Sequence, residues 1–107
     1  MNPVKIGLLG LGTVGGGTLR VLRRNHDEIS RRAGRAIEIT CASARDLDKP
    51  RDLALDGIVL TQDPTAVVDD PEVRIVAELI GGLEPARTLV LRAIQNGKHV
   101  VTANKAL

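Results

Sequence analysis

Three glycines near the amino terminus have a spacing that could bind phosphate. Gly10, Gly12 and Gly15 follow the apolar run 4–9 in the pattern G-x-G-x-x-G. The first glycine allows a tight turn, the second lets the backbone approach a pyrophosphate, and the third lets a helix pack closely on a strand. Backbone N–H groups at the start of that helix would then face the phosphates, where the helix dipole favours negative charge. We therefore expect a dinucleotide-binding turn made by Gly10, Gly12, Thr13, Val14 and Gly15.

Charged residues after the second predicted strand could select between two dinucleotides. Here an acidic side chain holds the ribose 2′-hydroxyl of NAD, whereas arginine accommodates the 2′-phosphate of NADP. The predicted helix over 13–32 moves this position beyond the usual spacing of about 20 residues, so the candidates are Ser43, Arg45, Asp46 and Lys49. Arg45 and Lys49 could hold a phosphate, which favours NADP. Asp46 keeps NAD as the alternative, and both cations could instead be ordinary surface charges.

Other residue types that often carry chemistry are not arranged for it. Cys41 lies in an apolar run without a histidine or an acid beside it in the sequence, which favours a buried and inert thiol. A lone cysteine cannot form an intramolecular disulfide, which indicates a reducing compartment. His26 and His99 have no partner at metal-ligand spacing, so we expect no metal site.

Composition limits the fold and the partners. The 107 residues are 43% hydrophobic but include no Phe, Tyr or Trp. This suits a single domain, 1–107, with a core of Val, Ile, Leu and Ala, as in a parallel sheet covered by helices. A net charge of only +2 and the lack of aromatic stacking argue against a nucleic-acid partner. No apolar run has the length of a membrane span and no signal peptide is evident, so we expect a soluble, cytoplasmic protein.

Strand and helix patterns alternate along the chain. Strands are expected at 4–9, 36–43, 58–61, 73–80 and 99–103, and helices at 13–32, after Asp63-Pro64 and after Pro85. Right-handed crossovers turn this α/β order into a doubly wound parallel sheet of the Rossmann type. We expect about five strands in the order 3-2-1-4-5 with helices on both faces. The glycine turn and Gly81-Gly82 should then meet at the ligand crevice, beyond the carboxyl ends of strands one and four.

Three further segments sharpen this prediction. They read R-D-L-D-K-P-R over 45–51, E-L-I-G-G-L-E-P-A over 78–86 and G-K-H-V-V-T-A-N-K-A-L over 97–107. With the glycine turn in register, they resemble homoserine dehydrogenase over essentially the whole chain. The resemblance is to the amino-terminal nucleotide-binding domain of that enzyme. Its substrate-binding and dimerisation region, and any regulatory domain, would follow Leu107.

The resemblance implies an oxidoreductase that uses NAD or NADP to interconvert L-homoserine and L-aspartate 4-semialdehyde, on the route to threonine, methionine and isoleucine. A hydride passes between C4 of the substrate and the nicotinamide. Lys105 matches the family's active-site lysine, which is thought to assist proton transfer at the substrate oxygen. Sequence alone would favour a solvated charge at that position. The residues expected near the nicotinamide end are Gly81, Gly82, Thr102, Ala103 and Asn104.

Gly81, Gly82 and Glu78 each keep more than one explanation. Gly81 and Gly82 could be present only because a turn needs a positive φ. Glu78, at the end of a buried strand, could face a ligand or form a salt bridge at the edge of the sheet.

The resemblance also shapes what we expect of assembly and activity. Without the substrate-binding region the chain alone should be inactive, whereas the complete enzyme is expected to be a homo-oligomer. The strand over 99–103 would be an open edge, through which copies could associate. The alternatives are a non-catalytic nucleotide-sensing or interaction module with the same sheet, and a related semialdehyde or imine reductase, against which the T-A-N-K segment argues.

Overall fold

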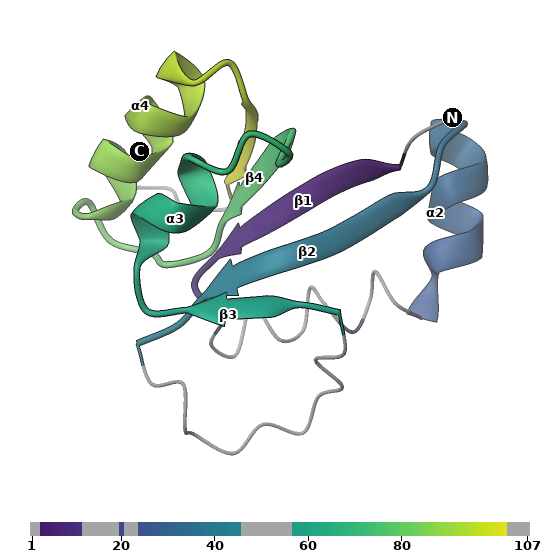
Figure 1. Ribbon diagram of the computed structural model, residues 1–107, viewed down its shortest axis with the longest axis horizontal. Helices are drawn as coiled ribbons and strands as arrows, with labels where there is room; N and C mark the ends of the chain where they lie inside the picture. The colour runs from purple at the N-terminus through teal and green to yellow at the C-terminus, as the bar shows by residue number, and fades with distance from the viewer. Residues whose placement is uncertain (1–2, 12–19, 21–23, 46–56, 103–107) are drawn as a thin grey trace.

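Five parallel strands form one sheet, with helices between most of them along the chain (Figure 1). The computed structural model describes residues 3–11, 20, 24–45 and 57–102. Its elements are β1 (Val4–Leu9), α2 (His26–Ala33), β2 (Ile37–Ser43), β3 (Val59–Thr61), α3 (Pro64–Val68), β4 (Ile75–Glu78), α4 (Ala86–Gln95) and β5 (His99–Thr102). The sheet order is β3-β2-β1-β4-β5, which confirms the predicted topology. No helix in the described segments is long and apolar enough to cross a membrane.

Successive residues of the central strands pack on opposite faces of the sheet. On one face Leu9, Cys41 and Val76 form a core cluster with buried residues of α3 and α4. On the other face Ile6 and Leu8 belong to a second cluster, made largely by strand residues. Figure 1 shows α3 and α4 together on one side of the sheet, and α2 away from them beside the start of β2. Strand β1 is thus apolar on both sides, as expected for a central parallel strand.

Local signals set several helix ends. Asp63 accepts a hydrogen bond from the Thr65 amide at 3.0 Å, and Pro64 is the first residue of α3, as the Asp63-Pro64 pair predicted. Gly34 ends α2 in the left-handed conformation, with φ of 73°.

The prediction of one uninterrupted helix over 13–32 is wrong at Asn25. This residue has φ of −107° and ψ of 20°, outside helical geometry, and α2 begins after it at His26. Residues 12–19 and 21–23 of the predicted helix lie outside the described part of the chain. Asparagine has a low helix propensity, because its side chain can form hydrogen bonds with the backbone in non-helical conformations.

A glycine in the middle of β1 lets α3 approach the sheet. A Cβ atom added to Gly7 would lie 2.5 Å from Cγ1 of Val67, and 3.3 Å from Sγ of Cys41 and from Cγ1 of Val73. Val67 and Val73 are almost completely buried, at 0% and 1% exposure. Helix α3 therefore packs directly on the backbone of β1, in space that any side chain at position 7 would occupy.

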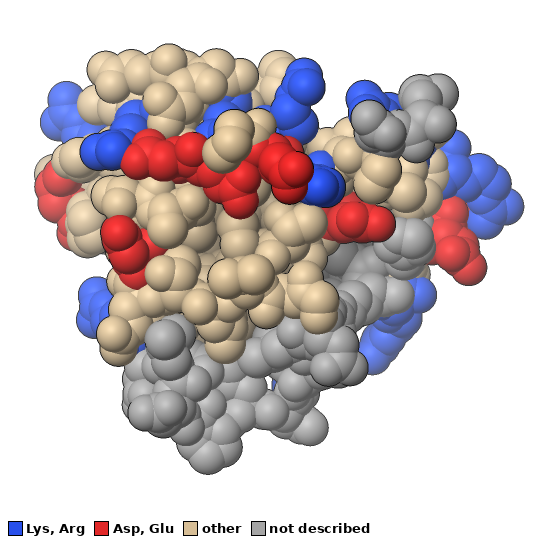
Figure 2. Space-filling view, viewed as in Figure 1, with Lys and Arg blue, Asp and Glu red and all other residues tan. Residues whose placement is uncertain are grey.

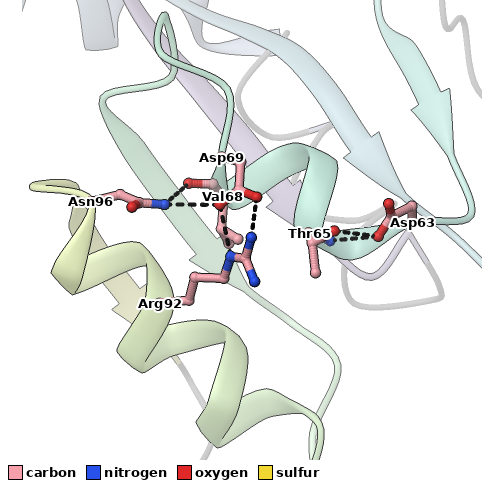
Figure 3. A network of polar contacts seen from close by, with 6 residues as sticks. All are labelled: Asp63, Thr65, Val68, Asp69, Arg92 and Asn96. Carbon is pink, nitrogen blue, oxygen red and sulfur yellow. Dashed lines mark hydrogen bonds and ion pairs between the residues drawn. The ribbon is translucent and has the colours of Figure 1, made fainter.

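Helices α3 and α4 are joined by a polar network at their ends (Figure 3). Asp69, which caps α3, accepts hydrogen bonds from Nε of Arg92 at 2.8 Å and from Nδ2 of Asn96 at 2.9 Å. Asn96 also donates to the Val68 carbonyl at 2.9 Å. In the space-filling view, acidic side chains run across this face with basic side chains on either side of them (Figure 2). The hydrogen bond from Arg92 lowers the pKa of Asp69 below its ordinary value of 3.8.

Replacing Gly7 with alanine should destabilise the fold. The new methyl group would overlap Val67, so α3 must shift, and overpacking of this kind costs about 1–3 kcal/mol. Urea denaturation followed by circular dichroism measures the loss. The double variant Gly7→Ala/Val67→Ala removes the overlapping methyl groups and should recover part of it. A Gly7→Ala protein as stable as the parent would show that α3 does not pack as described.

The Asp69–Arg92 pair should contribute stability that depends on pH. Because the pKa of Asp69 is lower in the folded state, the stability that the Asp69–Arg92 pair contributes is complete above the unfolded-state pKa. That stability is lost as the pH falls through the folded-state pKa. The free energies of unfolding of the parent and Asp69→Asn should differ by a constant amount above about pH 5, and the difference should narrow below about pH 4. A difference that stays constant throughout the acid range would contradict this assignment.

Candidate functional site

The register of the sheet brings five strand ends into one row. Leu9 of β1 pairs with Ser43 of β2 and with Glu78 of β4, Ser43 pairs with Thr61 of β3, and Glu78 pairs with Thr102 of β5. We call these residues the carboxyl-edge row. Four of them are polar, although the strands behind them are mainly apolar. Ligands of doubly wound sheets bind beyond such an edge, where the chain leaves β1 and β4 in opposite directions.

The glycine turn begins directly after the row and lies against the end of β4. Gly10 has φ of 94°, which L side chains rarely adopt. A Cβ atom at this position would also lie 3.2 Å from Cγ1 of Ile80 and 3.3 Å from its backbone. Two independent constraints therefore select glycine here. The expected requirement for glycine at position 10 is confirmed, and so is the meeting of this position with the segment that contains Gly81 and Gly82.

Ser43 fixes the start of this turn. Its hydroxyl accepts a hydrogen bond from the Gly10 amide at 3.1 Å, and its carbonyl accepts one from the Leu11 amide at 2.9 Å. These two amides therefore hold the turn against β2 and are not part of a phosphate-binding surface. Ser43, a candidate for the ribose position, serves the turn in this structure and is only 5% exposed. The other residues predicted at the turn are outside the described segments: Gly12, Thr13, Val14 and Gly15.

The glycine pair after β4 has a conformational requirement. Gly81 and Gly82 have φ of 82° and 74°, so the simpler explanation of these glycines, a turn with positive φ, is confirmed. A Cβ atom at either position would meet no atom within 4 Å among those compared. Both residues are exposed. The backbone here thus borders open space, as a ligand that approaches the main chain would require.

Glu78 is completely buried at the end of β4. Its carboxylate accepts hydrogen bonds from the Ile80 and Gly81 amides at 2.7 and 3.1 Å, and from the Thr102 hydroxyl at 2.7 Å. The sequence left open a ligand-facing carboxylate or a salt bridge. Neither alternative included these hydrogen bonds. Nothing in the local sequence pairs Glu78 with Thr102, because only the β4–β5 register brings them together.

The end of β2 presents Arg45 to solvent. Its carbonyl accepts a hydrogen bond from Nε2 of Gln62, which follows β3, at 3.1 Å. The local sequence does not indicate Gln62, since its contact with Arg45 depends on the pairing of β2 with β3. The other charged candidates of this turn, Asp46 and Lys49, lie outside the described residues.

The remaining candidates divide between the core and the end of the chain. Cys41 is buried, as predicted, and burial is the main reason that the pKa of its thiol is raised. Of the residues expected near the nicotinamide end, Thr102 lies in the carboxyl-edge row. Ala103, Asn104 and the candidate catalytic Lys105 are not among the residues described. Within the described ranges, no three His, Cys, Asp or Glu side chains are grouped to hold a metal ion.

Known proteins are similar to this chain in both sequence and fold. Residues 10–107 match the family described as Homoserine dehydrogenase, NAD binding domain, which indicates a nicotinamide dinucleotide as the ligand. The homoserine dehydrogenase of Methylobacillus glycogenes is 59% identical over the whole chain, and the match covers 26% of that protein. The corresponding values for the Pseudomonas aeruginosa enzyme are 56% and 24%.

Solved structures agree with these relatives. The crystal structure of a homoserine dehydrogenase from Thiobacillus denitrificans has a TM-score of 0.90 and 68% identity over 98% of this chain and 24% of that chain. The S. aureus homoserine dehydrogenase has a TM-score of 0.90 and 37% identity over 100% of this chain and 27% of that chain. This chain thus spans about a quarter of the length of the curated relatives it matches. With its sheet order, glycine turn and carboxyl-edge row, it belongs to the homoserine dehydrogenase family, in which it corresponds to the NAD binding domain.

Proposed function

We propose that this chain is the cofactor-binding part of an enzyme that interconverts L-homoserine and L-aspartate 4-semialdehyde, with NADP as the preferred cofactor. The observation that carries the proposal is the close approach of Gly10 to Ile80, the residue before the exposed Gly81 and Gly82. It supports a dinucleotide crevice between these two segments at the carboxyl edge of the sheet. The bound nicotinamide would supply the hydride chemistry.

The chain's own residues would bind and orient the cofactor. We assign the pyrophosphate to the glycine turn that Gly10 opens, and within it to the backbone amides of Gly12, Thr13, Val14 and Gly15. Gly81 and Gly82 would border the nicotinamide ribose, and Thr102 with Ala103 and Asn104 would border the nicotinamide end. Lys105 follows directly and would hold or release a proton at the substrate oxygen. For this step its pKa must move from about 10.4 towards the working pH, which requires desolvation or a nearby cation.

Arg45 supports the preference for NADP. It stands directly after β2 at the carboxyl edge, where the adenosine ribose of a dinucleotide lies in such sheets. Its side chain is exposed, and its backbone is tied to Gln62. A guanidinium can bind a phosphate through two parallel hydrogen bonds, and Lys49 would add a second positive charge. Asp46 would favour the ribose hydroxyl of NAD and remains the competing determinant.

Calorimetric titration of the 107-residue chain tests the proposal, because the chain has no tryptophan to report binding by fluorescence. We expect saturable binding of NADP⁺ and weaker binding of NAD⁺. Arg45→Ala should raise the Kd for NADP⁺ about tenfold, since a charge-assisted contact is lost, and leave the Kd for NAD⁺ nearly unchanged.

Arg31→Ala is the matched control for this titration. Arg31 is an exposed arginine of α2, before the start of β2 and far along the chain from the carboxyl-edge row, and it pairs with Glu28 at 2.7 Å. Its removal should change neither affinity. An Arg45→Ala protein with unchanged NADP⁺ affinity would overturn the NADP preference. A folded chain that binds neither dinucleotide up to millimolar concentration would overturn the proposed function itself.

We also propose that copies of this chain associate through β5. This strand stands at one end of the sheet order, with β4 as its neighbour, and Val101 is 62% exposed. An outer strand with apolar side chains favours pairing with another strand. Sedimentation velocity should show a sedimentation coefficient that rises with concentration, and Val101→Lys should reduce the rise. A parent chain that remains monomeric at high concentration would contradict the proposal.

A further inference from the structure

Glu78 is the one charged residue that is buried among those the structure describes. Its exposure is 0%, at the end of a strand whose neighbours are mainly apolar. Burying a carboxylate is costly unless hydrogen bonds replace the lost water. Hydrogen-bond donors must therefore converge on the Glu78 carboxylate. A buried charge of this kind indicates a specific role.

Two separate segments supply those donors. One oxygen, Oε2, accepts from the amides of Ile80 and Gly81, which belong to the loop after β4. The other oxygen, Oε1, accepts from the hydroxyl of Thr102, which lies at the end of β5 and 24 positions further along the chain. A single side chain thus connects the two segments that border the same part of the crevice.

From these contacts we infer that Glu78 is a positioning residue for the nicotinamide half of the cofactor. It holds the Gly81-Gly82 loop and Thr102 in a fixed relation, so that both can contact one ligand without a rearrangement. The inference rests on the proposed function. Ile80 extends the same constraint to the glycine turn, because its backbone lies against Gly10.

A test of this role has to remove the acceptors of Glu78 and keep the size of its side chain. A carboxylate has only acceptors, and both of its oxygens can receive several hydrogen bonds. Glutamine could keep all three contacts, because its oxygen can accept from the loop amides and its amino group can donate to the Thr102 hydroxyl. Methionine has a similar length and no strong acceptor. In Glu78→Met the loop amides and the Thr102 hydroxyl would therefore lose their shared partner while the sheet keeps its apolar core.

The test compares a complete dinucleotide with a ligand that lacks its nicotinamide half. For the parent chain, Glu78→Met and Thr102→Val, calorimetry would give the Kd of NADP⁺ and of adenosine 2′,5′-bisphosphate. Both variants should raise the Kd of NADP⁺ about tenfold, because ordered contacts at the nicotinamide end are lost, and change that of the bisphosphate by less than about twofold. If the parent prefers NAD⁺, the same comparison is made with NAD⁺ and ADP.

Glu72→Met is the matched control. Glu72 is an exposed glutamate before the start of β4, where it pairs with Lys5 at 3.0 Å, and its replacement should change neither affinity. Thr102 is exposed, so Thr102→Val remains informative if Glu78→Met does not fold. Equal losses for both ligands would show a purely structural role, and unchanged affinities would show no role, and either result overturns the inference. A parent chain that binds neither ligand would instead be a failure of the proposed function.

Discussion

The contact between the backbone of Gly10 and that of Ile80 determines the rest of the candidate site. It brings the turn after β1 to the loop after β4, and these are the two places where the chain leaves the sheet in opposite directions. Ser43 holds the turn from one side, and Glu78 holds the loop from the other. A substitution at Gly10 would disturb both sides at once, because it meets a positive φ as well as the backbone of Ile80.

Parts of this arrangement are encoded locally, and those parts could be predicted. The apolar strand runs, the Asp63-Pro64 cap and the spacing of Gly10 each act through neighbours in the sequence, so the sheet order and the place of the crevice followed from them. The roles of Ser43, Glu78 and Gln62 could not be predicted in this way. Each depends on a partner from another strand, and a partner of that kind is fixed only by the register. The prediction of a helix over 13–32 is wrong at Asn25, because the periodicity of hydrophobic residues does not show where a backbone leaves helical geometry.

Stability and site chemistry occupy different parts of the described structure. Helices α3 and α4 are bound to one face by buried valines and leucines, and to each other by Asp69, Arg92 and Asn96. The candidate cofactor residues lie at the carboxyl ends of the strands. Glu78 is the exception, because it is buried like a core residue and yet serves the loops of the crevice. This separation lets loops at the edge vary without loss of the packed layer beneath them.

The position of Cys41 has a consequence for how the packed layer moves. The single thiol of the chain lies under α3, beside Gly7, and its raised pKa keeps it protonated at neutral pH. A thiol reagent can reach it only while that helix is lifted from the sheet. The rate at which Cys41 is labelled therefore follows the frequency of this local opening. The native sequence thus contains its own probe of local unfolding on one face of the sheet.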